Sequence, residues 1–162
     1  MSSAHQPYLQ LSFTCLLNDR YEHVWFDAAH DHFLLFQDSY FYVLDPGDAV
    51  PSPKLFYHLL ENTPTKIINA KVSLDYQVLS IQVSHTSVLV IDIVKSKRWV
   101  VTIKHPNDST ILEPGMLWSD HGGGSQDLIL VTTRGLDLYK ISVPRNQCKL
   151  SRLLPQPIHK AW

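Results

Sequence analysis

Two histidines and an aspartate stand in three consecutive positions, His30-Asp31-His32, and these residue types bind metal ions or transfer protons. A metal site needs ligands that converge in space, and these two imidazoles share a face only if the segment is extended. No Cys-x-x-Cys or His-Glu-x-x-His pattern accompanies them. We therefore interpret the segment as a solvated turn between strands, and we expect no metal and no other cofactor.

Two other short motifs have a functional and a structural interpretation. The glycine run 122–124 lacks the Gly-Lys-Ser/Thr sequence and the following helix of a phosphate-binding loop, so we interpret it as a flexible strand connection. The basic run 95–98, beside Trp99, could touch phospholipid headgroups, but it fits better as the charged guard of an edge strand. No Gly-x-Ser-x-Gly elbow and no Cys/His nucleophile pattern is present. We expect no catalytic residue and no enzymatic activity.

Three aspartates recur at the ends of short apolar strands, at Asp27, Asp75 and Asp120. Their spacings are 48 (75 minus 27) and 45 (120 minus 75) residues. Recurrent carboxylates could be catalytic acids, but a residue that recurs once per unit at a turn is explained by the repeat, because Asp accepts hydrogen bonds from its own downstream backbone. A period of about 40–50 residues with four strands per unit is typical of a β-propeller blade.

The repeated short strands between these aspartates predict an all-β fold. We expect a partial β-propeller of about three four-stranded WD40-like blades. Propellers need about 4–8 blades, so we expect the chain to be truncated before the ring closes. We place the blades at about residues 21–63, 64–113 and 114–157 of one domain, 1–162, with an extra strand at 8–16. The predicted strands are 23–27, 32–36, 40–44 and 54–60; 67–74, 77–84, 88–93 and 97–103; 115–120, 127–133, 136–141 and 149–154.

Composition places the chain among folded proteins without a nucleic-acid partner. Of 162 residues, 44% are hydrophobic and 18% charged, with a formal net charge of −1. No apolar run approaches the roughly 20 residues of a membrane helix, and the first residues lack the pattern of a signal peptide. We expect a cytoplasmic protein in which Cys15 and Cys148 are free thiols, with a bridge between them as the open alternative.

Three segments resemble a known family: Trp25 to Asp38, Lys71 to Ile93 and, above all, Gly115 to Lys140. They are similar to the amino-terminal propeller of the regulator of the Mon–Ccz complex, the Bulli/Mic-one domain family. The ending, His159 to Trp162, resembles the opening of that family's next blade. The resemblance covers nearly the whole chain but only the first part of the longer family protein. The sequence does not contain the helical carboxy-terminal region of the family, so a fragment, a truncated isoform and an incomplete gene model are open alternatives.

The resemblance implies a non-catalytic scaffold or regulatory subunit. Its expected partner is the Mon–Ccz heterodimer, the guanine-nucleotide exchange factor of the late-endosomal Rab GTPase, Rab seven. The implied roles are endosome maturation, autophagy and lysosomal trafficking, at the surfaces of late endosomes, lysosomes and autophagosomes. No contact residue, nucleic acid or small-molecule substrate is implied. Two alternatives remain: a propeller adaptor of another vesicle-trafficking assembly, and a propeller enzyme with a central site, which the mostly apolar inner strand 67–74 disfavours.

Overall fold

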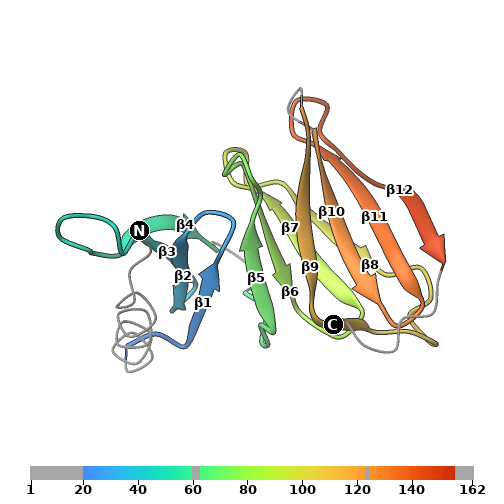
Figure 1. Ribbon diagram of the computed structural model, residues 1–162, viewed down its shortest axis with the longest axis horizontal. Helices are drawn as coiled ribbons and strands as arrows, with labels where there is room; N and C mark the ends of the chain where they lie inside the picture. The colour runs from blue at the N-terminus through green and yellow to red at the C-terminus, as the bar shows by residue number, and fades with distance from the viewer. Residues whose placement is uncertain (1–19, 60–62, 123–124, 156–162) are drawn as a thin grey trace, which may run out of the picture. The chain divides into compact units, whose positions relative to one another are not determined.

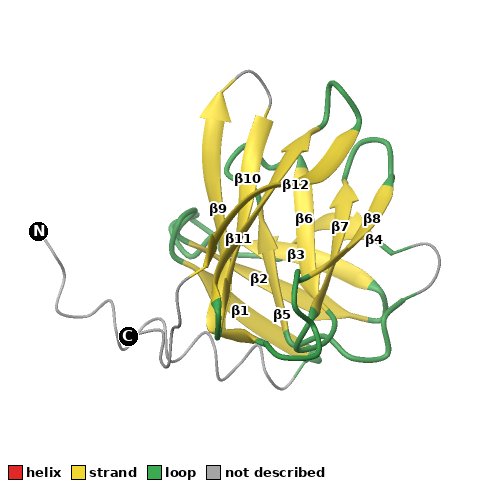
Figure 2. Ribbon diagram, turned by 90° about the vertical axis from the view of Figure 1, so that its right-hand side faces the viewer, coloured by secondary structure: helices red, strands yellow, loops and turns green. Residues whose placement is uncertain are grey.

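The computed structural model describes residues 20–59, 63–122 and 125–155, and these residues form strands and turns (Figures 1 and 2). Within these ranges no helix is present that could span a membrane. The chain divides into two compact units, Met1–Thr63 and Pro64–Trp162, which we call unit 1 and unit 2. The predicted extra strand 8–16, Cys15 and the ending 159–162 lie outside the described residues.

Unit 1 holds one antiparallel sheet in which each strand pairs with the next along the chain. Its strands are β1 (His23–Asp27), β2 (His32–Gln37), β3 (Tyr40–Leu44) and β4 (Lys54–His58). Asp38 and Ser39 both have positive φ, the backbone of a two-residue hairpin turn, so Gln37 pairs directly with Tyr40. Phe33, Leu35 and Leu44 are the centre of the small core.

Unit 2 holds two sheets with the same order of consecutive antiparallel strands. The first contains β5 (Asn69–Val72), β6 (Val78–Gln82), β7 (Ser87–Asp92) and β8 (Arg98–Thr102). The second contains β9 (Ile111–Gly122), β10 (Ser125–Thr132), β11 (Gly135–Ser142) and β12 (Gln147–Pro155). Strands β6 and β7 are buried almost throughout. The sequence of β7 is nearly continuous in apolar residues, as expected for a strand covered on both faces, whereas β6 alternates and also buries Ser80 and Gln82.

The two sheets of unit 2 share one hydrophobic core. Its buried members are Val78, Val88, Val90, Val101, Ile103, Ile111, Met116, Leu128, Leu130, Tyr139 and Ile141. Because both sheets contribute to this cluster, neither buries its apolar face alone, as expected for neighbouring repeats.

The three four-stranded antiparallel sheets confirm the predicted all-β, partial-propeller fold class. One predicted boundary is wrong: β9 begins at Ile111, so the division between residues 113 and 114 falls inside a strand. The reason is that β9 is an edge strand with a register shift between Leu130 and Thr132 of its partner. An edge strand with a bulge tolerates Pro114, which lacks a backbone N–H, so this proline does not end the strand.

Candidate functional site

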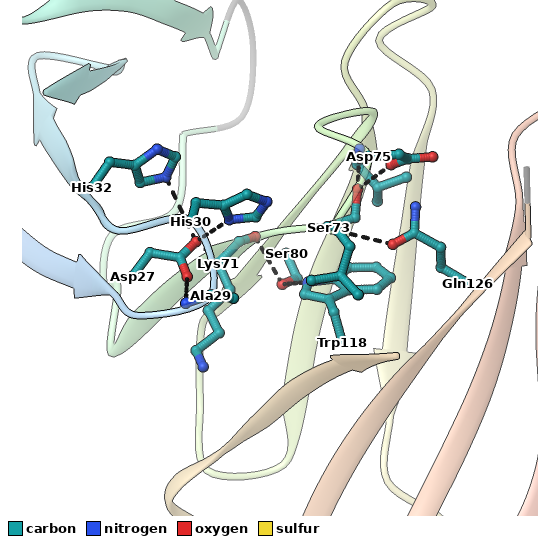
Figure 3. Close-up of polar contacts among 12 residues, drawn as sticks. Asp27, Ala29, His30, His32, Lys71, Ser73, Asp75, Ser80, Trp118 and Gln126 are labelled. Carbon is teal, nitrogen blue, oxygen red and sulfur yellow. Dashed lines mark hydrogen bonds and ion pairs between the residues drawn. The ribbon is translucent and has the colours of Figure 1, made fainter. Parts of the chain in front are cut away.

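The turn between β1 and β2 brings one carboxylate and two imidazoles together (Figure 3). Asp27 and His32 face each other in the antiparallel ladder, so their side chains emerge on the same side of the hairpin. His30 Nδ1 donates a hydrogen bond to Asp27 Oδ2 at 2.7 Å, and His32 Nε2 lies 3.6 Å from the same oxygen. The other carboxylate oxygen, Oδ1, accepts the backbone N–H of Ala29 at 3.0 Å.

This cluster is buried, so the expectation of a solvated turn is wrong for the two histidines. The side chains of Asp27, His30 and His32 are 8%, 7% and 4% exposed. Only the middle residue of the sequence motif, Asp31, is exposed, with φ 57° in the turn. Burial raises the pKa of the Asp27 carboxyl, but the neighbouring His32 and His30 outweigh burial and hold this pKa below its usual range. The sequence motif alone did not identify Asp27 as a partner of the two histidines. Asp27 lies five positions before His32, on the other strand of the hairpin.

The recurring aspartates have the predicted structural role at two of three positions. Asp27 accepts the backbone N–H of Ala29, and Asp75 Oδ1 accepts the backbone N–H of Gln77 at 3.0 Å. Asp120, by contrast, lies inside β9 opposite Gln126, so the expectation of a turn there is wrong. The cause is the length of the hairpin: β9 continues to Gly122 and β10 begins at Ser125, which also shortens the predicted glycine-rich loop.

A groove of about 440 Å³ lies between the outer strands of the two sheets in unit 2. Residues 99–104, in and after β8, line one side; Tyr139 of β11 and residues 148–150 of β12 line the other. Strands β8 and β12 are each at the edge of their sheets, so the groove runs between two edge strands. The exposed side chain of Val100, 73% accessible, is at its margin. Such an edge offers hydrogen-bonding groups to an added strand.

Basic side chains surround this groove. Lys104 and Lys149 line it, and Lys97 lies 5.9 Å from the centre of the Trp99 ring, the distance of a cation–π contact. The sequence predicts that the basic run 95–98 protects an edge strand from pairing with another chain. The structure places this run immediately before and at the start of edge strand β8. Apolar and aromatic surface with a basic margin suits a partner segment with apolar and acidic residues.

Two hydrogen bonds join the two sheets of unit 2 (Figure 3). The indole Nε1 of Trp118 donates to Ser80 Oγ at 3.1 Å. The backbone N–H of Leu74 donates to Gln126 Oε1 at 2.9 Å. Both bonds join residues far apart in the sequence, and they fix how the two sheets of unit 2 pack.

Two further bonds between the sheets shape the groove itself. The backbone N–H of Lys104 donates to Asp137 Oδ2 at 2.8 Å, and the Tyr139 hydroxyl donates to the carbonyl of Thr102 at 2.7 Å. Cys148 is a free, half-buried thiol, and burial raises its pKa to about 11. Its predicted alternative, a bridge to Cys15, involves a residue outside the described part of the chain.

Tyr139 makes unit 2 sensitive to alkaline pH. Burial, with the charges of Asp137 and Cys148, raises the pKa of Tyr139 to about 12. An unfolded tyrosine titrates at about 10, so the contribution of Tyr139 to stability is complete below about pH 10 and is lost as pH rises toward 12. We expect Tyr139→Phe to lose about 1 kcal/mol at neutral pH and to flatten the loss of stability above pH 10. Denaturant unfolding across this pH range measures both effects, and an unaltered loss of stability above pH 10 in Tyr139→Phe would contradict this role of Tyr139.

Comparison with known proteins places the chain in a family. The curated proteins contain no match. Three solved structures share 12% of residues with it: the N-terminal domain of Nup159 (83% of this chain, 30% of that chain, TM-score 0.40), the fission yeast SREBP-SCAP binding domains (86%, 39%, 0.52) and a protein from Lactobacillus plantarum (83%, 41%, 0.45). The second supports the fold alone, and the chain spans less than half the length of each of the three. The family model described as "Regulator of MON1-CCZ1 complex, N-terminal" matches residues 24–148. This chain therefore belongs to the family of the N-terminal domain of the regulator of the MON1-CCZ1 complex.

Proposed function

We propose that this chain is a non-catalytic scaffold that binds the MON1-CCZ1 heterodimer and supports its activation of the late-endosomal Rab GTPase. In this proposal the chain is cytoplasmic and reaches late endosomes, lysosomes and autophagosomes through its partner. Its contribution to endosome maturation and autophagy is then to hold the exchange complex in an active arrangement, with no chemical step of its own.

The observation that carries the proposal is the family match over residues 24–148, which spans β-strands of all three sheets. The match covers most of the described residues, so it rests on the repeated architecture as a whole and not on one short motif. Two carboxylates that could act as catalytic acids, Asp27 and Asp75, have a structural role in this architecture, because each accepts a backbone N–H group in a turn. These uses support a binding role.

We further propose that the groove of unit 2 contacts the heterodimer. Val100 lies on edge strand β8 and is 73% exposed, and it lines the groove together with Trp99 and Leu150. The basic residues Lys104 and Lys149 select an acidic partner segment. An extended segment of the heterodimer with alternating apolar and acidic residues could therefore pair with the β8 backbone and place its side chains in the groove.

Co-precipitation with the purified MON1-CCZ1 heterodimer tests both parts of this proposal. We expect the wild-type chain to be retained and Val100→Glu to bind at least about tenfold more weakly, because an added carboxylate opposes an acidic segment and breaks the apolar contact. Val94→Glu is the matched control: Val94 is 77% exposed but lies in the turn before β8, outside the groove. It should bind like wild type.

The results of this experiment distinguish the proposed binding function from the proposed contact surface. Failure of the folded wild-type chain to bind the heterodimer contradicts the proposed function. Equal binding of the wild type and Val100→Glu contradicts only the proposed surface. Nucleotide exchange on the Rab GTPase by the chain alone, measured by release of a fluorescent nucleotide, contradicts the non-catalytic role.

A further inference from the structure

We propose that Asp27, His30 and His32 form a binding site for one divalent transition-metal ion, for which zinc is the best match. The proposal is independent of binding to the MON1-CCZ1 complex. It rests on one carboxylate oxygen and two imidazole nitrogens that lie within 4.8 Å of one another in the turn between β1 and β2 (Figure 3).

The three ligand types suit zinc. Zinc binds imidazole nitrogen and carboxylate oxygen, and sites with three protein ligands leave a fourth tetrahedral position for water or another group. Imidazole also suits copper, iron and nickel, whereas magnesium and calcium prefer sites made of oxygen ligands alone. With two nitrogens and one oxygen, the donor set therefore favours a transition metal over an alkaline-earth ion.

The distances are close to those of a tetrahedral site. Zinc bonds of about 2.0–2.2 Å at tetrahedral angles place ligand atoms about 3.3–3.6 Å apart. Asp27 Oδ2 and His32 Nε2 are already 3.6 Å apart. Asp27 Oδ2 and His30 Nδ1, 2.7 Å apart, form a hydrogen bond and must separate by about 0.6–0.9 Å on metal binding. The imidazole rings of His30 and His32 lie nearly parallel, with 5.0 Å between centroids and 16° between planes. Because each nitrogen lone pair lies in the plane of its ring, one ring must turn about its Cβ–Cγ bond to direct both lone pairs at one ion.

The surrounding backbone holds the ligands in place before any ion binds. Asp27 and His32 are opposite each other in the β1–β2 ladder, which fixes the separation of their Cα atoms. The N–H of Ala29 holds Asp27 Oδ1, so that Oδ2 is directed toward both imidazoles. A hydrogen bond to the second oxygen of a ligating carboxylate is the usual support of a metal site.

Because the cluster is buried, a nearby cation stabilises the ionised carboxylate of Asp27. The three side chains are at most 8% exposed, and an ionised carboxylate in such surroundings is costly unless a positive charge is near. Protonated imidazole can supply that charge, and so can a divalent ion. Metal binding is thus in competition with protons for the same nitrogens, and only a direct binding measurement separates a metal site from a hydrogen-bonded cluster.

Titration of the untagged, chelator-treated 162-residue protein with Co²⁺ and then Zn²⁺ provides this measurement. We expect one Co²⁺ per chain, with the visible absorption of a tetrahedral site, and displacement by Zn²⁺. Asp27→Asn, His30→Gln and His32→Gln should each weaken binding at least about tenfold, the lower limit seen for loss of a supporting residue. The matched control is His105→Gln, because His105 is an exposed histidine of unit 2. It should bind Co²⁺ like wild type.

Two results would overturn the proposal: absence of Co²⁺ and Zn²⁺ binding at protein concentrations of about 100 µM, or unchanged binding by the three folded variants. If a variant fails to fold by circular dichroism, the wild-type protein still decides the question. Nitrogen NMR of its imidazoles should then show Zn²⁺-dependent shifts at His30 and His32. Shifts confined to other histidines would contradict the assignment.

Discussion

Replacing Leu130 by Ala is expected to lower the free energy of unfolding of unit 2 by about 2–5 kcal/mol. Leu130 is 0% exposed and lies on β10, the strand between β9 and β11. It belongs to the core cluster that both sheets of unit 2 share, so its removal leaves a cavity that affects both sheets. Urea unfolding followed by the fluorescence of Trp99 and Trp118, which pack against this cluster, measures the change.

The same substitution at an exposed leucine is the control for Leu130. Leu154 is on β12 of the same sheet and is 39% exposed, so Leu154→Ala should change the free energy by less than about 1 kcal/mol. Equal losses for the two variants would mean that the apolar cluster is not the main source of stability in unit 2.

Gly115→Ala is the second substitution for which we expect a large loss of stability, about 3 kcal/mol. A Cβ atom at Gly115 would clash with the carbonyl oxygen of Leu112 and lie 2.9 Å from that of Val131. Both contacts are with backbone, which cannot rotate away as a side chain can. The strand would have to shift at the irregular pairing of β9 with β10, and thermal unfolding should report it as a lower melting temperature.

Gly47→Ala is the matched control for Gly115. A Cβ atom there would meet only the side-chain oxygen of Asp45, at 3.2 Å, in the loop between β3 and β4. We expect a change within about 0.5 kcal/mol. A melting temperature for Gly115→Ala equal to that of the control would contradict the tight packing at the bulge.

The architecture could be predicted from the sequence because it repeats. Alternation in strands such as β6 and the spacing of Asp27 and Asp75 depend on local rules, and the structure has strands and turns where these rules place them. A second set of turn residues also recurs between the third and fourth strands of each sheet. Asp45, Asp92 and Ser142 accept the backbone N–H of residues two or three positions later, at 2.8, 3.0 and 3.4 Å.

The candidate sites could not be predicted because they depend on pairing between strands. Nothing local in His30-Asp31-His32 shows that the carboxylate of Asp27 completes the cluster; the register of the β1–β2 hairpin does so. The extension of β9 through Pro114 likewise depends on its edge position. The groove requires the packing of one sheet on the next, and the contact of Tyr139 with Thr102 joins positions 37 residues apart.

The proposed binding of this chain to the MON1-CCZ1 complex can be measured by isothermal titration of the purified chain into the purified heterodimer. We expect saturable binding with one chain per heterodimer and a dissociation constant below about 10 µM, since an exposed groove with two strand edges offers a specific surface. Absence of saturable binding at concentrations up to about 100 µM, with the chain folded, would contradict it.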